Sequence, residues 1–315
     1  MIGIDLGGTK LSAALFSPEG DVLMRTTAPL GKRSGPEVGA LIVETARSLF
    51  EEAESAAIDS IGVAVPGIYH SGRGTVWAPN IAGWNDYPLL AELSDAFGHR
   101  ARVEVASDRA AYILGEEWLG AARGCRNAIF IAVGTGIGAG LLVDGRVVQG
   151  EGDVAGAIGW LALQRPCRDV YESCGCFEYH ASGPGLVRVA REMLESAEYS
   201  SVLRSRDPET LTAEDVFAAL DKGDELASAV IDDAIALWGM AAANMVSLLD
   251  PEIIVFGGGV FGPAARFLDR IHDEARRWAQ PISMHQVRFA VSELGGDAGL
   301  YGAGRLAILG GVRAP

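Results

Sequence analysis

The stretch IGIDLGGTK, residues 2–10, decides the fold of this 315-residue chain. Its apolar run ends in two glycines and a threonine, which is typical of a strand that turns tightly into a second strand. NAIFIAVGTGIGAGLLVDGRVVQG (127–150) repeats this opening, with a further turn at Asp144-Gly145 before a third strand. Two such openings predict two similar α/β lobes that face each other across a cleft.

Composition supports a soluble two-domain protein and excludes some partners. Hydrophobic residues make up 49% of the chain and charged residues 21%, and the length exceeds what one compact core usually supports. The formal net charge of −15 would repel a phosphate backbone, so we expect no nucleic-acid partner.

Neither a membrane span nor a leader peptide is expected. The longest apolar stretch, residues 128–143, is broken by glycines and therefore indicates two strands around a turn. The chain begins directly on an apolar strand, without a basic and apolar leader. We therefore expect a cytoplasmic protein.

Two glycine turns are candidate phosphate sites: DLGGTK (5–10), called here the first phosphate turn, and GTGIG (134–138), the second phosphate turn. Glycines leave backbone N–H groups free to face an anion, and threonine hydroxyls add donors. Ordinary hairpin turns are the alternative, but two matched turns favour nucleotide phosphate. The candidate nucleotide-binding residues are Asp5, Gly7, Gly8, Thr9, Lys10, Gly134, Thr135 and Gly136, with ATP expected between Thr9 and Thr135.

Asp5 and a third glycine turn complete the candidate nucleotide site. Asp5 ends the first strand, where a carboxylate could hold a hydrated Mg²⁺ beside phosphates or simply bond within the hairpin turn. GGG (257–259), the third glycine turn, follows the strand EIIVF, and Gly258 and Gly259 would let an adenosine lie against backbone.

Five motifs in order resemble the ROK family (repressors, open reading frames and kinases) of sugar kinases. They are IGIDLGGTK (2–10), VPG…APNIAGW (65–84, the sugar loop), SDRAAYILGE (107–116), AVGTGIGAGL (132–141) and GCFEYHASG (175–183). The resemblance covers nearly the whole chain. It implies the two-lobed actin–hexokinase–Hsp70 ATPase fold, with ribonuclease H-like duplicated lobes around an interlobe cleft. We expect the N-terminal lobe to comprise residues 1–108 plus 298–315, and the C-terminal lobe residues 109–297.

The resemblance also implies site residues. Asp108 would be the general base that draws the proton from a primary hydroxyl as it attacks ATP; the alternative is an N-cap for the helix that follows. Asn80 and Glu178 match positions that bind ring hydroxyls, and Gly67 matches a glycine that lines the sugar loop. Repressor members carry a DNA-binding segment before the first strand, which starts here at residue 2, so the resemblance favours the kinase branch.

Three departures from the family pattern fall on the sugar side. Relatives usually read Ala-Gly-Glu-x-Gly-His after the second phosphate turn, where this chain has Ala157 and Trp160, and Ser107 replaces an Asn beside Asp108. Losing two charged hydrogen bonds to a sugar would cost roughly 3–6 kcal/mol. We therefore expect an amino, deoxy or carbocyclic C7 sugar analogue as substrate, with Trp160 as an apolar wall or as ordinary core packing. The alternatives are a common hexose kinase such as a glucokinase, and an inactive nucleotide- or sugar-binding pseudokinase.

The cysteines leave a zinc site open. The family's zinc motif uses Cys-x-Cys-Gly-x-x-Gly-Cys and the missing His, and here only Cys176 fits, while positions 169 and 171 are Asp and Tyr. Cys167, Cys174 and Cys176 with a fourth ligand such as His180 could hold Zn²⁺, or the thiols could pack without metal. Cys125 is expected to be a lone thiol. We expect a homodimer or homotetramer.

Overall fold

The computed structural model describes residues 1–53, 58–196 and 199–312, and this part of the chain forms two compact units. Unit 1 comprises Met1–Ala128, Gly140–Gly156 and Ser292–Pro315, and unit 2 comprises Ile129–Ala139 and Ala157–Val291. The C-terminal segment groups with unit 1. Residues 109–128, 140–156 and 292–297, which were expected in the C-terminal lobe, also group with unit 1.

The sheet of unit 1 carries the first phosphate turn at one end. Its strand order is β3-β2-β1-β4-β7, in which β1 pairs antiparallel with β2 and parallel with β4. The hairpins come from the predicted glycine turns, and the parallel pairs place the ends of β4 and β7 at the edge where β1 also ends. The strands are β1 (Ile2–Leu6), β2 (Lys10–Phe16), β3 (Val22–Pro29), β4 (Ser60–Val65) and β7 (Arg102–Ser107).

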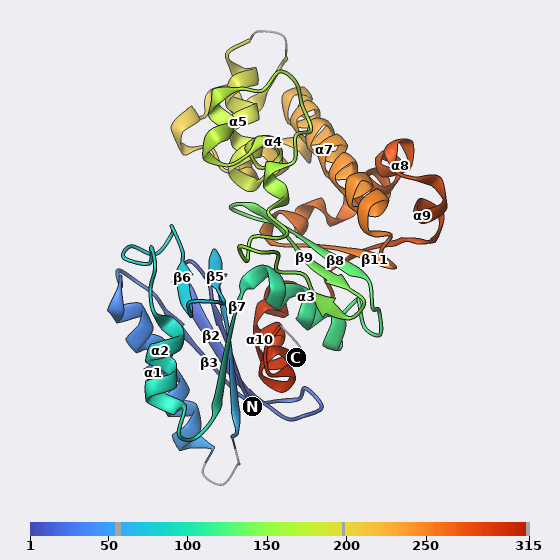
Figure 1. The fold of residues 1–315 in the computed structure, drawn as a ribbon. Helices are drawn as coiled ribbons and strands as arrows, with labels where there is room; N and C mark the ends of the chain where they lie inside the picture. The colour runs from blue at the N-terminus through green and yellow to red at the C-terminus, as the bar shows by residue number, and fades with distance from the viewer. Residues whose placement is uncertain (54–57, 197–198, 313–315) are drawn as a thin grey trace. The chain divides into compact units, whose positions relative to one another are not determined.

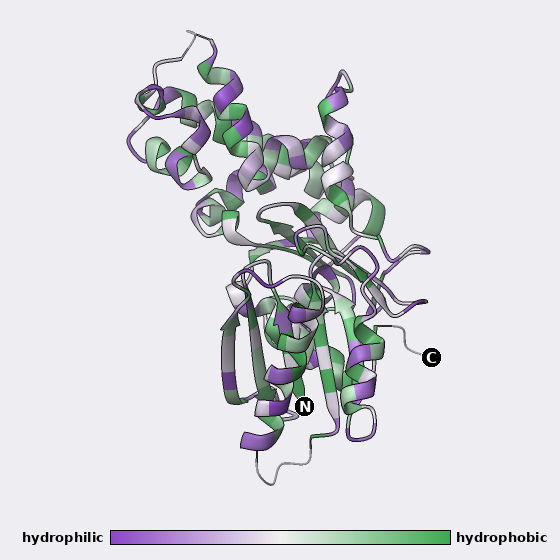
Figure 2. Cartoon of the chain, turned by 90° about the vertical axis from the view of Figure 1, so that its left-hand side faces the viewer, coloured by the Kyte–Doolittle hydropathy of each residue, from purple (hydrophilic) through white to green (hydrophobic). Residues whose placement is uncertain are grey.

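Helices cover both faces of this sheet (Figure 1). Helices α1 (Pro36–Glu52) and α2 (Leu89–Phe97) pack on one face, and α3 (Asp108–Leu119) and α10 (Ala298–Leu309) pack on the other. Small residues allow a close approach of α3 and α10: a Cβ on Gly302 would lie 1.8 Å from the Ala111 carbonyl oxygen. This contact explains why α3 belongs to unit 1. The strands are largely apolar (green in Figure 2), and buried apolar residues of α1 and α2 join them in one core.

The second sheet repeats the order of the first. Its order is β10-β9-β8-β11-β12, so an N-terminal three-stranded meander is again followed by two further strands, with β11 and β12 parallel. The predicted turn before β10 is present, with positive φ at Asp144 and Gly145. The duplication expected from the sequence is therefore confirmed. The strands are β8 (Ala128–Val133), β9 (Ile137–Val143), β10 (Arg146–Val147), β11 (Ile253–Gly257) and β12 (Arg288–Val291).

Unit 2 carries most of the helices that follow. They are α4 (Cys176–Ala181), α5 (Gly183–Leu194), α6 (Ala213–Leu220), α7 (Glu225–Leu249), α8 (Leu268–Trp278) and α9 (Pro281–Gln286). Among the described residues, α7 alone is long and apolar enough to cross a membrane, but 67% of its apolar window is buried within the protein. Trp238 on α7 is fully buried and donates from Nε1 to the Ala181 carbonyl at 3.1 Å. These features identify α7 as a core helix.

Several elements differ from the sequence expectation. The structure adds α2, α6, α9 and the hairpin of β5 (Ile68–His70) and β6 (Thr75–Trp77), which were not predicted. The segment 263–278 begins as a 3₁₀ helix, Pro263–Phe267, and continues as α8. The remaining 3₁₀ helices are Ile158–Trp160, Asp169–Ser173, Val202–Ser205, Pro208–Thr210, Gly259–Phe261 and Gly295–Asp297.

Candidate active site

Asp108 lies at the end of β7 as the first residue of α3. Its Oδ1 accepts a hydrogen bond from the backbone N–H of Arg109 at 2.7 Å, and the Tyr112 hydroxyl donates to Oδ2 at 3.4 Å. Ser107 occupies the N-cap position, so the alternative role of Asp108 as the N-cap of α3 is wrong. The carboxylate is held by its own first helical turn and is only partly buried.

Burial raises the pKa of Asp108 to about 6. The positive charge of Arg109 and the two hydrogen bonds oppose this rise. A carboxylate with this pKa is largely ionised at neutral pH, yet it is basic enough to take a proton from a reacting hydroxyl. Arg109 and Tyr112 were not predicted as site residues from the sequence, although both lie within about one turn of Asp108.

Ser107 connects the sugar loop to the end of β7. Its Oγ accepts a hydrogen bond from the backbone N–H of Tyr69 at 3.0 Å. Gly67, two residues before Tyr69, has φ +80°, and a Cβ there would lie 2.2 Å from the Trp77 carbonyl oxygen. Only glycine allows this approach, so the expected glycine of the sugar loop has a clear structural reason.

Asn80 is exposed and lies next to the first phosphate turn. A Cβ on Gly8 would sit 3.3 Å from Asn80 Nδ2. Trp84 anchors this part of the sugar loop, because its fully buried indole donates to the Gly35 carbonyl at 2.9 Å and stacks on Tyr87. The structure thus places Asn80 within unit 1, beside the turn that is expected to bind phosphate.

The first phosphate turn leaves its central backbone open. The Gly7 N–H donates to the Lys10 carbonyl at 2.9 Å, and Gly8, Thr9 and Lys10 are exposed. This arrangement presents N–H and hydroxyl donors to solvent, as an anion site requires.

Asp5 provides an oxygen site that fits a divalent cation. Its carboxylate packs against Gly299 in the first turn of α10, where a Cβ would lie 2.7 Å from the Asp5 Cγ. Burial, followed by the negative charge of Asp108, raises the pKa of Asp5 to about 7. A buried carboxylate near other acids is favoured in its ionised form by a bound cation, and Mg²⁺ prefers oxygen ligands.

In unit 2, Glu178 on α4 contacts the second phosphate turn. Its Oε2 accepts a hydrogen bond from the backbone N–H of Ile137 at 2.6 Å, and a Cβ on Gly136 would lie 2.8 Å from the same oxygen. Burial raises the pKa of Glu178, while the Ile137 hydrogen bond and Arg188 lower it. Thr135 and Gly136 are at least partly exposed beside this contact. The residue expected to bind the sugar thus contacts the turn expected to bind phosphate.

The third glycine turn also lies beside the second phosphate turn. A Cβ on Gly134 would lie 3.9 Å from the Gly259 N, and a Cβ on Gly258, whose φ is +88°, would lie 2.4 Å from the Val133 carbonyl oxygen. The Gly183 N–H donates to the Gly134 carbonyl at 2.8 Å, so the start of α5 joins the cluster. Gly258 and Gly259 are exposed. Their bare backbone is open to a flat ligand.

The segment that follows the second phosphate turn exposes Trp160. Trp160 is 58% exposed, so the alternative of ordinary core packing is wrong. Ala157 is the N-cap residue of the 3₁₀ helix Ile158–Trp160 and is partly buried. Neither side chain offers a charged acceptor.

The zinc hypothesis has no support in the geometry. Among the described residues, no group of three or more His, Cys, Asp or Glu side chains could hold a metal ion. Cys167 is exposed, Cys176 is buried, and His180 Nε2 is already hydrogen-bonded to the Tyr171 hydroxyl at 2.8 Å. The thiols of Cys167, Cys174 and Cys176 therefore do not form a site. Cys125 is buried and is not part of a disulfide.

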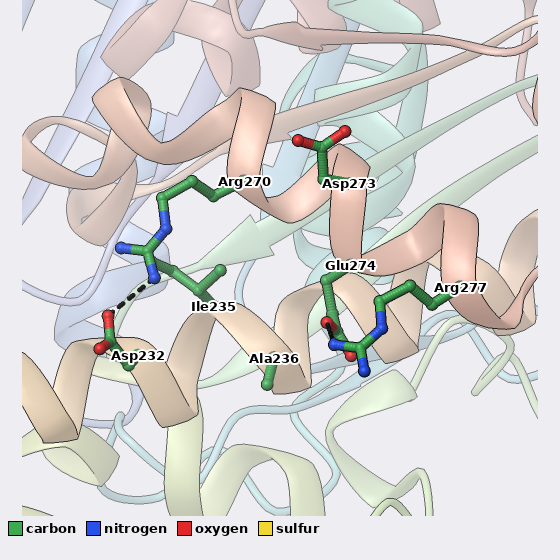
Figure 3. A pocket seen from close by; sticks show the side chains of 7 residues that line it. All are labelled: Asp232, Ile235, Ala236, Arg270, Asp273, Glu274 and Arg277. Carbon is green, nitrogen blue, oxygen red and sulfur yellow. Dashed lines mark hydrogen bonds and ion pairs between the residues drawn. The ribbon is translucent and has the colours of Figure 1, made fainter.

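Two shallow surface hollows lie away from these residues. One of about 330 Å³ lies between α7 and α8 and is lined by charged side chains, including the Arg270–Asp232 ion pair of 2.8 Å (Figure 3). The other, of about 370 Å³, lies between α1 and α2. Neither hollow contains any of the candidate site residues.

Comparison with known proteins identifies the family to which the chain belongs. Residues 1–309 match the model of the ROK family. The chain is 32% identical to a glucokinase from Halalkalibacterium halodurans over 97% of this chain and 94% of that protein. Its fold matches the ROK hexokinase from Thermus thermophilus with a TM-score of 0.83, at 30% identity over 98% of both chains. It also matches a ROK family glucokinase from Streptomyces griseus in complex with glucose and AMPPNP (TM-score 0.76, 28% identity, 98% and 99% covered).

The duplicated sheets and these matches define an α/β protein of the actin–hexokinase–Hsp70 ATPase fold. The chain belongs to the ROK family.

Proposed function

We propose that this chain is an ATP-dependent sugar kinase that phosphorylates a primary hydroxyl of a sugar or sugar-like polyol. The observation that carries the proposal is Asp108, a partly buried carboxylate with raised pKa at the end of β7, beside Ser107 and the sugar loop. The ROK kinases that the chain resembles support the same class of reaction.

Asp108 acts as the general base. Its carboxylate accepts the proton of the substrate hydroxyl while that oxygen forms a bond to the γ-phosphorus of ATP. The bond between the γ-phosphorus and the β,γ-bridging oxygen breaks, and ADP leaves. Tyr112 and the Arg109 N–H keep the carboxylate in place, and the proton is later lost to solvent.

The glycine turns of each unit are the nucleotide-binding segments that we propose. In unit 1, Gly8, Thr9 and Lys10 offer donors, while Gly7 closes the turn by donating to the Lys10 carbonyl. In unit 2, the second phosphate turn and Gly258–Gly259 form one cluster. Asp5 would hold Mg²⁺ through water, and the ion, when bound, neutralises charge on the phosphates. The AMPPNP bound by the Streptomyces griseus glucokinase supports ATP as the phosphoryl donor.

The substrate we propose is not plain glucose. Asn80 and Glu178 remain available for hydroxyls, but Ala157 and the exposed Trp160 stand where the family pattern has Glu and His. An apolar wall makes unmatched hydroxyls costly to desolvate. An amino, deoxy or carbocyclic C7 analogue with a primary hydroxyl near Asp108 fits this site better.

A glucokinase is the second candidate, because the Halalkalibacterium halodurans relative bears that name. An ADP-release assay over glucose, aminohexoses, deoxyhexoses and cyclitols separates the two. Our proposal predicts the highest kcat/KM on an analogue and weak turnover of glucose. Highest turnover on glucose would replace it with the second candidate.

We also propose that the chain forms a homodimer or homotetramer. Three large apolar side chains on unit 2 are strongly exposed: Leu248 (72%), Trp278 (62%) and Ile282 (76%). They lie at the ends of α7 and α8 and on α9, and exposed apolar side chains of this kind favour association. Light scattering of the purified protein tests this proposal, and a monomer at all concentrations would refute it.

A further inference from the structure

Glu178 lies on a very short helix that needs outside support. Helix α4 has six residues, and an isolated helix of this length is unstable in water. Its other residues must therefore be fixed by neighbours if Glu178 is to keep its contact with Ile137. The neighbours come from the 3₁₀ helix Asp169–Ser173 and from α5.

Aromatic rings and hydrogen bonds connect α4 to these neighbours. Tyr179 and His180, the two residues after Glu178, pack edge to face with Tyr171 at ring-centroid distances of 5.4 and 5.6 Å. The Tyr171 hydroxyl is 2.8 Å from His180 Nε2. Only 6% of Tyr171 is exposed. The 3₁₀ helix is thus joined directly to α4.

Charged side chains make further contacts with Tyr179 on α4. Glu192 on α5 accepts hydrogen bonds from Arg168 at 2.9 Å and from the Tyr179 hydroxyl at 2.8 Å. The Arg168 guanidinium also lies over the Tyr179 ring at 5.1 Å, and Arg188 lies over the same ring at 4.7 Å. Arg168 lowers the pKa of Glu192, which keeps the acceptor ionised.

His180 behaves as a network member rather than as a metal ligand. Burial, followed by the charge of Arg168, lowers the pKa of His180, which favours the neutral imidazole. A neutral imidazole could bind a metal, but its Nε2 already shares a hydrogen bond with Tyr171. The described part of the chain brings no three candidate ligands together here.

We infer that this network of Arg168, Tyr171, Tyr179, His180 and Glu192, without a bound metal ion, fixes α4 and thereby positions Glu178. The network stands where the family resemblance would place zinc, and Tyr171 occupies one of the positions of the missing cysteines. The five are positioning residues. Their kinetic role rests on the proposed function of Glu178, whereas their structural role does not.

The test uses the full chain and two variants, each with a matched control. Tyr171→Phe removes only the hydroxyl that meets His180, and Tyr301→Phe in unit 1 is its control, because no hydrogen bond to that hydroxyl is found among the described residues. Arg168→Met breaks the ion pair with Glu192, and Arg270→Met breaks the similarly exposed pair with Asp232 on α7 (Figure 3). Arg168 is partly exposed, so its variant will fold even if the Tyr171 variant is poorly stable.

The expected results concern metal content, melting temperature and kinetics. The purified protein should contain no stoichiometric zinc, and a zinc-selective chelator should leave its Tm unchanged. Tyr171→Phe and Arg168→Met should each lower Tm by about 2 °C or more relative to their controls. Each should raise the sugar KM about three- to tenfold while kcat changes less.

Two results would overturn the inference. One is stoichiometric zinc whose removal lowers Tm; the other is Tm values of both variants equal to those of the controls. Complete lack of kinase activity would refute the proposed function instead, and the metal and Tm measurements would still decide the inference.

Discussion

The Glu178 carboxylate accepts a 2.6 Å hydrogen bond from the backbone N–H of Ile137, within the second phosphate turn. Within unit 2, this contact joins a residue proposed to bind the sugar to the turn proposed to bind the nucleotide. A substitution at Glu178 should therefore affect the binding of the sugar. It should affect the binding of the nucleotide as well if the new side chain cannot accept the hydrogen bond from Ile137.

Two substitutions at Glu178 separate these effects. Glu178→Gln keeps an oxygen for Ile137 but loses the charge, so we expect the sugar KM to rise about tenfold and nucleotide affinity to stay nearly constant. Glu178→Ala leaves the Ile137 N–H without this acceptor, so nucleotide affinity should fall as well. Steady-state kinetics and nucleotide titration measure both. Equal nucleotide affinity in the two variants would show that the contact does not shape the phosphate turn.

Asp108→Asn should lower kcat by at least about 10³-fold and leave nucleotide affinity nearly unchanged, because the amide is no longer a base. Asp86→Asn is the matched control, since that carboxylate bonds to Thr75 and Arg73 on the surface. More than a tenth of the wild-type kcat in Asp108→Asn would assign the base to another residue.

The pH profile follows from the pKa of about 6 at Asp108. Only the ionised carboxylate accepts a proton. With saturating MgATP, which keeps Asp5 ionised, kcat/KM for the sugar should rise with pH, reach half its plateau near pH 6, and stay high above pH 7. Arg109 favours the ionised form, so Arg109→Met should move the midpoint to higher pH. A midpoint that stays in place or moves to lower pH would contradict this electrostatic role.

The double variant Ala157→Glu/Trp160→His tests the substrate. Restoring two charged or polar partners should raise kcat/KM on glucose at least about tenfold and lower it on the preferred analogue. The single variants show whether the two positions act together. A kcat/KM for glucose near about 10⁴ M⁻¹s⁻¹ or above in the unmodified protein would contradict the proposed specificity.

The backbone conformation of Gly175 leads to a stability prediction for the segment around Trp160. Its φ is +85°, and a Cβ would lie 2.4 Å from the Gly159 carbonyl oxygen. Gly175→Ala should therefore destabilise the protein by about 1–3 kcal/mol in chemical denaturation. Gly72→Ala, where a Cβ meets open space, is the control. Equal stability of the two variants would mean that the segment around Trp160 relaxes freely.

The sequence predicted the features that repeat or that depend on backbone conformation. Both meanders and their glycine turns are present, because apolar alternation and glycine are local signals. Helix α2 and the β5–β6 hairpin were missed because each is short and lies inside the sugar loop or beside it. Their bounds depend on contacts between residues that are distant in sequence, such as the hydrogen bond from Trp84 to the Gly35 carbonyl.

Site contacts between residues that are distant in sequence could not be predicted from the sequence. The bonds of Ser107 with Tyr69 and of Glu178 with Ile137 join positions 38 and 41 residues apart, and no local pattern encodes them. Cysteine spacing suggested a zinc site, but spacing does not show that Cys167 is exposed while Cys176 is buried. The aromatic network around His180 was missed for the same reason.

Detection of a phosphorylated product tests the central claim most directly. The purified chain is incubated with ATP, Mg²⁺ and the panel of sugars and cyclitols, and the products are analysed by mass spectrometry and ³¹P NMR. The account predicts a phosphate monoester on a primary hydroxyl, formed by the wild-type protein and nearly lost in Asp108→Asn. Nucleotide binding without a phosphorylated product from any member of the panel would contradict it and indicate a pseudokinase.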